Sequence, residues 1–315
     1  MRLMSHYVHV AVLFFSLSAR AEFDLKCYLK GECSGNWRSS SSNNPSTGSQ
    51  VRINPSVVPT DEGFGLEGQF YKSEVDMALV RGTGRIGAAI SPSNSEETFF
   101  GPPGFELTQD YLERKQDAKK LPSQKFTLST AINLFNHQGS GLDSYSLKLG
   151  FMAKYNKLTA GLSPGAGLST IWGALSVGGS VYNDETQLEN NLFYPTRVMK
   201  LKYQVQTYNV GLFLSSLVLD YSQLTLTSDD LAEPYKVTLM TASLMVADFI
   251  ITAARRTEVS DRPLYSYDTK LLETKKIKDD YFGGIQYRIN KNIMVGVFYN
   301  YYLLRETSVS TTLFF

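Results

Sequence analysis

Hydrophobic and polar residues alternate with a period of two along most of the chain from Gly63 onward. Successive side chains on a strand point to opposite faces, so this alternation predicts strands with one apolar and one polar face. Between residues 145 and 156 the apolar positions are Tyr145, Leu147, Leu149, Phe151, Ala153 and Tyr155. The same pattern recurs at 201–206, 285–290 and 293–301, and in each stretch we expect the apolar face to contact lipid.

Alternation alone is also typical of soluble β-sandwiches, and three further features favour a membrane protein. Aromatic residues such as Tyr145 and Tyr155 end an apolar face, where a girdle at the membrane interface would place them. The stretches are close to the ~9–11 residues that a tilted strand needs to cross a bilayer. The sequence also ends on an alternating stretch that closes with Phe315. We therefore predict an all-β fold, a transmembrane antiparallel β-barrel over residues 63–315.

The pattern predicts about 14 strands, with 12 or 16 as alternatives. Their expected ranges are 64–72, 75–81, 84–91, 125–134, 145–155, 157–163, 166–182, 201–213, 215–224, 236–246, 248–257, 281–289, 292–302 and 307–315. The long connections, such as 92–124 and 258–280, then fall on one side of the membrane and the short ones on the other, except for 135–144. Long outer loops and short inner turns are typical of bacterial outer-membrane barrels.

Residues 1–21 have the pattern of a secretory signal peptide: Arg2, an apolar stretch from Val8 to Leu17, and a small-x-small site at 19–21. We therefore expect the protein in the outer membrane of a Gram-negative bacterium, with outer-membrane lipid around it and the barrel-assembly machinery as its partner during insertion. In an oxidising compartment, Cys27 and Cys33 are expected to form a local disulfide.

Composition excludes several functional classes. A formal net charge of +1 argues against a nucleic-acid-binding protein, which would carry a basic excess. Once the signal peptide is removed, His137 is the only histidine, and it falls in an expected periplasmic turn. A histidine-dependent nucleophile at the outer rim therefore has no candidate base. We expect no enzyme activity, no cofactor and no metal site.

Residues 22–62 are polar and poor in strand signals before Asn54-Pro55-Ser56 leads into the first strand. Asn54 and Pro55 resemble the first two positions of the Asn-Pro-Ala hatch motif of the FadL family of outer-membrane transporters, with Ser56 in place of alanine. That resemblance implies a fourteen-stranded barrel, an N-terminal plug in the lumen, a side opening in the wall and long-chain fatty acids or other hydrophobic small molecules as ligands. A spacer outside the lumen is the alternative for this segment.

Two further stretches are candidate functional elements. Gly82, Gly84 and Gly87 could kink the wall beside the lumen, although ordinary turn geometry explains them as well. Phe99, Phe100 and Phe105, in the long connection 92–124, could line an entry site for an apolar ligand, or they could pack the loop on itself.

Two functions compete on this evidence. The first is transport of hydrophobic solutes through a plugged lumen, with a sideways exit near the third strand. The second is a water-filled diffusion porin in which inward-facing charges, such as Lys148, Lys154 and Arg288, set the ion preference.

Overall fold

The structure is a computed structural model. It describes residues 51–60, 62–70, 75–93, 118–120, 125–137, 145–157, 159–190, 197–214, 216–228, 234–262, 273–276, 280–290, 292–300 and 307–315. The expected signal peptide at 1–21, Cys27 and Cys33, and Phe99, Phe100 and Phe105 all lie outside these residues.

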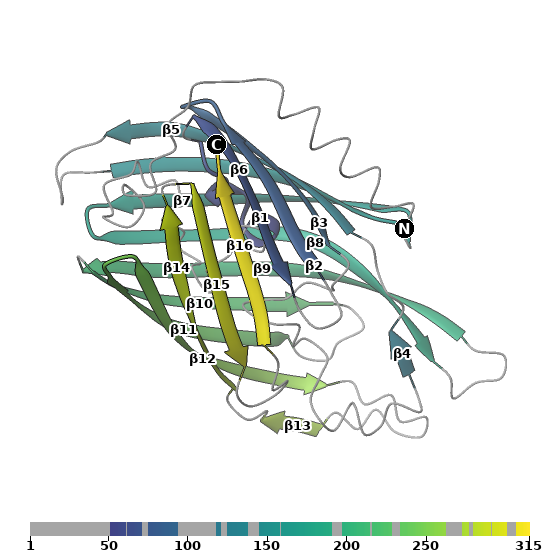
Figure 1. Cartoon of the computed structure of the whole chain (residues 1–315). Coiled ribbons are helices and arrows are strands. Elements are labelled where there is room, and N and C mark those ends of the chain that lie inside the picture. Colours follow the sequence, from purple (N-terminus) through teal and green to yellow (C-terminus); the bar gives the residue numbers. More distant parts are fainter. Residues whose placement is uncertain are drawn as a thin grey trace, which may run out of the picture.

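Strands make up nearly all of the described chain (Figure 1). Their bounds are β1 Gly63–Phe70, β2 Val75–Gly82, β3 Ile86–Ser93, β4 Ala118–Lys120, β5 Lys125–His137, β6 Tyr145–Asn156, β7 Gly161–Trp172, β8 Leu175–Asn190, β9 Arg197–Leu214, β10 Leu217–Thr227, β11 Tyr235–Val246, β12 Phe249–Arg262, β13 Glu273–Lys276, β14 Asp280–Asn290, β15 Ile293–Asn300 and β16 Thr307–Phe314. Residues 51–53 are helical, and a 3-10 turn, η1 Pro55–Val57, follows them before the first strand. In the described part of the chain, no helix is long and apolar enough to span a bilayer.

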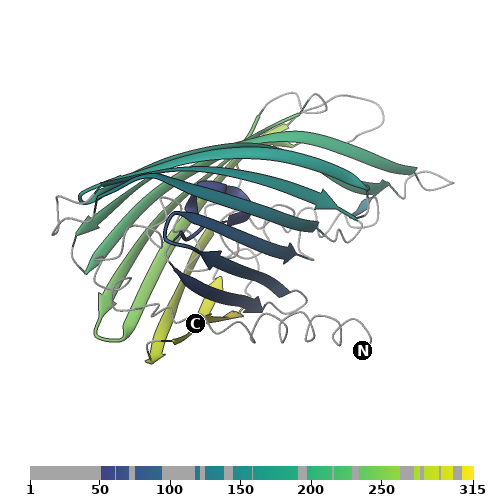
Figure 2. The same cartoon turned by 90° about the horizontal axis from the view of Figure 1, so that it is seen from above.

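Fourteen of the described strands form a closed antiparallel barrel, as the alternation predicted (Figure 2). Each strand pairs with its neighbours in sequence, and β1 pairs with β16 from Gly65–Phe314 to Phe70–Val309. Phe64 and Phe315 extend this seam, because each donates its backbone N–H to the carbonyl of the other. The short strands β4 and β13 only extend β8 and β12. A closed barrel leaves no strand edge unpaired, which is what a sheet in lipid requires.

The expected strands at 157–163 and 166–182 had the wrong bounds. These ranges leave residues 164–165 as a connection, but Pro164 lies inside β7 and pairs with Ala153 of β6. Pairing between β7 and β8 begins only at Gly165, so the missing N–H of Pro164 breaks no bond on that side. The true turn is Gly173-Ala174, where Gly173 has a φ of 57°. A tight hairpin turn needs such positive φ angles, which glycine adopts without strain.

The directions of the side chains on the strands agree with a membrane-spanning barrel. On β6 the burial alternates without a break, with Phe151 and Tyr155 exposed and Lys148 and Lys154 buried. Exposed apolar side chains form an outward-facing surface around the barrel, including Leu128, Leu168, Leu212, Ile251, Ile285 and Val297. Many of the buried, inward-facing side chains are polar, including Ser129, Ser146, Ser222, Thr241, Gln286 and Ser310. Apolar residues outside and polar residues inside place this wall in lipid, and we assign the protein to the outer membrane.

The shortest connections all lie at one end of the barrel. They join β2 to β3, β7 to β8, β9 to β10, β11 to β12 and β14 to β15. The longest connection lies at the opposite end, between β3 and β5, and contains β4. We therefore take the tight turns as periplasmic and the other end as extracellular. With 16 and 18 residues, β8 and β9 exceed the ~9–11 residues needed to cross the bilayer.

Candidate functional site

The apolar side chains change from the outer to the inner face of the wall part-way along β9. In its periplasmic half, Tyr208, Val210 and Leu212 are exposed on the outer face. In its extracellular half, Tyr203 and Val205 are buried on the inner face. The pairing of β9 with β8 and β10 shows no register shift, so the backbone alternates regularly throughout. The apolar positions themselves therefore change phase between Val205 and Tyr208.

The same change of phase occurs on neighbouring strands at nearly the same height. Leu219 is exposed on the periplasmic half of β10, whereas Leu224 and Leu226 are fully buried further up. Met240 and Leu244 of β11 are exposed, whereas Val237 and Leu239 are fully buried. These residues build one continuous surface, which we call the inner apolar surface: Tyr203, Val205, Leu224, Leu226, Val237 and Leu239.

This arrangement corrects the sequence interpretation of 201–206. Tyr203 and Val205 were expected to contact lipid, but they face the lumen, and Lys202, Gln204 and Gln206 are the exposed residues. The outer polar side chains form their own ladder, in which Gln206 Nε2 donates to Gln204 Oε1 at 3.0 Å. Amide side chains on the outer face indicate water or lipid headgroups there, so this part of the wall extends beyond the hydrocarbon layer.

Tyr208 and Tyr221 mark the height at which the wall leaves the hydrocarbon layer. Tyr208 is 48% exposed on the outer face, directly below the first outward glutamine of its strand. The Tyr221 hydroxyl donates to Gln223 Oε1 at 3.3 Å, which places it between an apolar and a polar surface. Tyrosines are enriched at this interface because the ring is apolar and the hydroxyl is polar. The inner apolar surface therefore lies inside the extracellular end of the barrel, above the bilayer edge.

The inner apolar surface belongs to a buried cluster that also contains Ile53, Met152, Tyr182 and Ala254. None of the cluster members is more than 8% exposed. Burial of one Leu or Val side chain contributes roughly 1.5–3 kcal/mol, so this cluster is a substantial apolar element on the inner face of the wall. A second, smaller buried apolar cluster consists of Val51, Val58, Ala78, Val80, Ala89 and Ala131.

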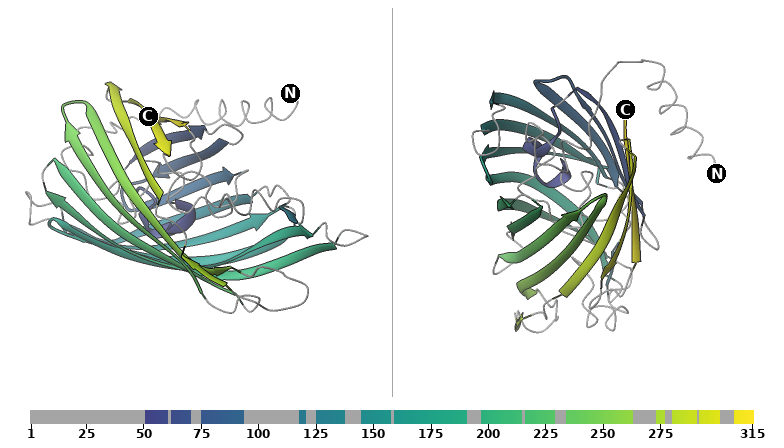
Figure 3. Two further views of the ribbon diagram at one scale, coloured as in Figure 1. Left: turned by 90° about the horizontal axis from the view of Figure 1, so that it is seen from below. Right: turned by 60° about the vertical axis from the view of Figure 1, so that its left-hand side comes forward.

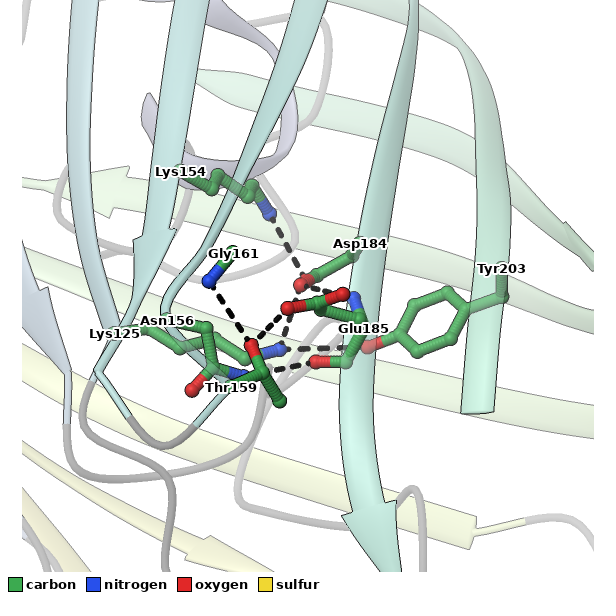
Figure 4. A network of polar contacts seen from close by, with 8 residues as sticks. All are labelled: Lys125, Lys154, Asn156, Thr159, Gly161, Asp184, Glu185 and Tyr203. Carbon is green, nitrogen blue, oxygen red and sulfur yellow. Dashed lines mark hydrogen bonds and ion pairs between the residues drawn. The ribbon is translucent and has the colours of Figure 1, made fainter. Parts of the chain in front are cut away.

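A buried charge cluster borders this surface on β5, β6 and β8 (Figure 4). The Lys125 ammonium lies 2.9 Å from Asp184 Oδ1, and the Lys154 ammonium lies 3.8 Å from Asp184 Oδ2. All three side chains are nearly inaccessible to solvent. Asp184 also accepts the backbone N–H of Glu185 at 2.7 Å. One carboxylate therefore holds two buried ammonium groups from different strands.

Two tyrosines connect the charge cluster to the apolar cluster. The Lys154 ammonium lies over the Tyr182 ring, 3.7 Å from its centre. The Lys125 ammonium donates to the Tyr203 hydroxyl at 3.4 Å, and Tyr203 is part of the inner apolar surface. Each lysine thus contacts both a carboxylate and an aromatic ring, an arrangement that compensates part of the cost of burying it.

The neighbouring turn is tied to the same strand. Thr159, in the turn between β6 and β7, donates to the Glu185 carboxylate, and the Asn156 amide donates to the Glu185 carbonyl at 3.0 Å. Glu185 is therefore held by the turn while Asp184 holds the lysines. Arg52, which is 3% exposed, acts electrostatically on Lys154 and Tyr182. Two lysines therefore pair with the Asp184 carboxylate, and Arg52 lies close enough to influence Lys154.

Residues 51–60 lie within the barrel, against its inner wall (Figure 3). Three serines of the wall donate to backbone carbonyls of this segment: Ser129 to Val51 at 2.7 Å, Ser180 to Ile53 at 2.7 Å and Ser169 to Ser56 at 3.4 Å. Since the donors come from β5, β7 and β8, the segment is held across several strands. Residues 22–50 of the expected plug lie outside the described residues.

Asn54 and Pro55, the two positions of the suggested hatch motif, form the start of η1. Asn54 caps the turn, because its Oδ1 accepts the Ser56 N–H at 3.1 Å and the Ser56 hydroxyl at 2.7 Å. Ser56 therefore makes a contact that an alanine could not. Gly150 allows the backbone of Pro55 and Ser56 to approach β6, since a Cβ there would lie 2.2 Å from the Ser56 nitrogen.

Gly82, Gly84 and Gly87 surround the turn between β2 and β3. Gly84 has a φ of 89° in the turn itself. Gly87 faces inward, where a Cβ would lie 2.1 Å from the Pro59 carbonyl oxygen. The turn thus explains Gly84, and the close approach of Pro59 explains Gly87. That these glycines kink the wall stays a prediction.

Sequence reasoning singled out Lys154 but missed Lys125, Asp184, Tyr182 and Tyr203. The signal that could have found Tyr182 and Tyr203 is the change of phase in the alternation, whereas Lys125 and Asp184 leave no such signal. On β9 the apolar positions are odd up to Val205 and even from Tyr208, and β8, β10 and β11 change phase in the same way. Among the described residues, no group of three or more His, Cys, Asp or Glu side chains could hold a metal ion.

Comparisons with known proteins add only a likeness of shape. No family model matches the chain, and no curated protein matches it. Among solved structures, the CymD monoaromatic hydrocarbon channel is 10% identical, with 85% of this chain and 92% of that chain covered and a TM-score of 0.43. The toluene transporter TodX of Pseudomonas putida is 9% identical (85% and 92% covered, TM-score 0.37), and OmpF of Salmonella typhi is 6% identical (80% and 95% covered, TM-score 0.40). The likeness concerns the shape of the barrel and not its solute.

Proposed function

We propose that this protein carries hydrophobic solutes across the outer membrane and takes them up on the inner apolar surface at the extracellular end of the lumen. The observation that supports this proposal is the change of phase on β9, β10 and β11, which turns Val205, Leu226 and Leu239 toward the lumen above the bilayer edge. A porin for polar solutes gains nothing from an apolar lining at its entrance, whereas an apolar solute leaves water there.

The charge cluster narrows the proposed class to amphiphiles with a carboxylate, such as long-chain fatty acids. Lys125 and Lys154 lie beside Tyr203 and Tyr182, so a carboxylate on the ammonium groups would leave its alkyl chain on the inner apolar surface. Charge-assisted hydrogen bonds to a carboxylate are roughly twice as strong as neutral ones. Asp184 would then share its lysines with the bound solute.

We also propose a sideways exit between β2 and β3. The pairs Asp76–Ser93 and Leu79–Ile90 share one register, but the two intervening pairs are missing from the ladder. Pro92 lies in this gap and has no N–H to donate. The Ser91 hydroxyl donates instead to the Met77 carbonyl at 2.7 Å. A weakened ladder is where a wall would separate most readily.

The test is binding of tritiated oleate to the purified protein in phospholipid vesicles. We expect the double variant Val205→Gln/Leu226→Gln to weaken binding at least roughly tenfold, because two buried amides cost more than the ~1.4 kcal/mol that corresponds to tenfold. The matched control is Gln206→Asn, on the outer face of the same strand, which should bind as the wild type does. Wild-type protein that binds no oleate but conducts ions freely would overturn the proposal.

A diffusion porin is the second candidate, because the inner wall at membrane height is polar. Thr207, Asn209 and Thr252 are among its buried polar side chains. Deletion of residues 22–60 separates the two functions in single-channel recordings. A plugged transporter should show a large rise in conductance, whereas an open porin should show almost none. Neither function requires catalysis, and we propose that the protein is not an enzyme.

A further inference from the structure

A row of polar side chains crosses the inner wall below the inner apolar surface. Ser176 of β8 pairs with Gly211 of β9, Gly211 with Asp220 of β10, and Asp220 with Thr241 of β11. All of these positions face inward, and the three side chains are at most 5% exposed. Four adjacent strands thus present three oxygen-bearing side chains at one height, separated by a glycine.

The space above Gly211 is where two of these side chains converge. A Cβ on Gly211 would lie 2.5 Å from Ser176 Oγ and 2.6 Å from Asp220 Oδ1. Both oxygens therefore reach toward the same point from opposite sides. On the far side of the carboxylate, Thr241 Oγ1 lies 3.5 Å from Asp220 Oδ2. The missing side chain of Gly211 lets a hydroxyl and a carboxylate oxygen approach each other at this position.

The next row up supplies two more polar side chains. Asn209 pairs with Ser222, and each is 1% exposed. Within the described chain, Ser176 Oγ, Ser222 Oγ and both amide atoms of Asn209 are buried and make no hydrogen bond. A buried polar group without a partner costs roughly 1–3 kcal/mol, and such groups in native proteins usually face an ordered water or an ion. Several of them around one carboxylate point to a ligand.

The donor set identifies the class of ligand. It consists of one carboxylate, three hydroxyls and one amide oxygen, with no thiolate or imidazole. Oxygen donors alone favour hard cations over zinc or copper. Calcium accepts six to eight oxygen ligands in flexible geometry, including carbonyls and water, whereas magnesium demands a near-ideal octahedron. We propose that the inner wall binds a hard cation of the calcium class above Gly211, coordinated by Asp220 and Ser176, with Asn209, Ser222 and Thr241 around it.

This site is separate from the proposed transport function. It lies on the membrane-spanning part of the wall, where an ionisable side chain is costly to keep unless it has a function. A cation there would bind Asp220 and link the strands that carry the inner apolar surface further up. Loss of the cation would therefore loosen β8–β11 without removing the apolar residues themselves.

The experiment uses full-length protein in detergent, stripped with a chelator and titrated with calcium chloride, magnesium chloride, sodium chloride or choline chloride. Bound calcium is measured by equilibrium dialysis with radioactive calcium, and stability by the midpoint of thermal unfolding. We expect calcium to bind and to raise the midpoint more than magnesium or choline does. Asp220→Asn and Gly211→Ala should each weaken calcium binding roughly tenfold or more.

The matched control is Asp248→Asn in a periplasmic turn, where the carboxylate pairs with Arg288 on a partly exposed surface. This variant should bind calcium as the wild type does. If Asp220→Asn fails to fold, Ser176→Ala keeps the test decisive, because it removes one ligand and leaves the charge. No calcium binding by the wild type, or equal binding by the Asp220, Gly211 and Ser176 variants, would overturn the proposal. Unchanged oleate binding in these variants would leave the transport function standing.

Discussion

The Lys154 ammonium lies 3.7 Å from the centre of the Tyr182 ring, although the two residues belong to strands that are not neighbours. β7 runs between β6 and β8, and Gly165 of β7 makes room for the contact. A Cβ on Gly165 would lie 2.4 Å from the Tyr182 Cβ and 2.8 Å from the Met152 Cγ. The missing side chain lets β6 and β8 pack on each other across β7, and this joins the charge cluster to the apolar cluster.

The first prediction concerns the cation–π contact itself. Tyr182→Phe keeps a ring below the Lys154 ammonium, whereas Tyr182→Leu removes it. A desolvated cation–π contact is worth about 2 kcal/mol, so we expect Tyr182→Leu to lower the free energy of unfolding by at least this amount and Tyr182→Phe by much less. Urea unfolding in phospholipid vesicles measures the difference. Equal losses for the two variants would show that the hydroxyl group, and not the ring, carries the contribution of Tyr182.

The second prediction concerns Asp184. Asp184→Asn leaves Lys125 and Lys154 buried without their shared carboxylate, and breaking a buried pair in this way costs roughly 3–5 kcal/mol. Asp184→Leu combined with Lys125→Met removes one charge of each sign and should recover part of that loss. The same unfolding assay tests both variants. A double variant as unstable as Asp184→Asn would mean that the two side chains do not depend on each other.

The strands were predictable from the sequence because lipid imposes a strict alternation on each of them. The number of strands, the closed barrel and the outward direction of Phe151 and Tyr155 all follow from that one constraint. The rule fails where lipid ends. Above Tyr208 the outer face meets a polar environment, so Val205 and Tyr203 are free to face the lumen. A prediction that assumes lipid along the whole of β9 therefore assigns Tyr203 and Val205 to the wrong face.

The charge cluster was out of reach for a different reason. Lys125, Lys154 and Asp184 lie on three strands and are up to 59 residues apart in sequence. Alternation gives the face on which a side chain lies, but not its height relative to other strands. The registers of β5 on β6, β6 on β7 and β7 on β8 bring these residues to the same level, and local sequence does not encode them.

The third prediction tests where the bilayer ends on β9. Gln204→Cys and Leu212→Cys place a thiol on the outer face of one strand, above and below Tyr208. In a background with Cys27 and Cys33 replaced by serine, a water-soluble maleimide should label position 204 on intact cells and leave position 212 unlabelled. Labelling at both positions, or at neither, would contradict an interface at Tyr208. Adding detergent, which removes the lipid, should make position 212 reactive and serves as the control.

The last prediction concerns the hold of the barrel on residues 51–60. A Cβ at Gly150 would lie 2.2 Å from the Ser56 nitrogen and 2.3 Å from the Pro55 carbonyl carbon, and neither backbone atom can move alone. Gly150→Ala should therefore displace the segment from β6 and raise the ion conductance in planar bilayers, if residues 51–60 restrict the lumen. Gly68→Ala is the control, because its added Cβ would meet only the Phe70 ring, at 3.1 Å, and a side chain can rotate away.

Wild-type conductance in Gly150→Ala, together with an unchanged thermal midpoint, would show that the segment tolerates the methyl group without leaving the wall. A lower midpoint with unchanged conductance would show that the segment stabilises the barrel but does not restrict the lumen.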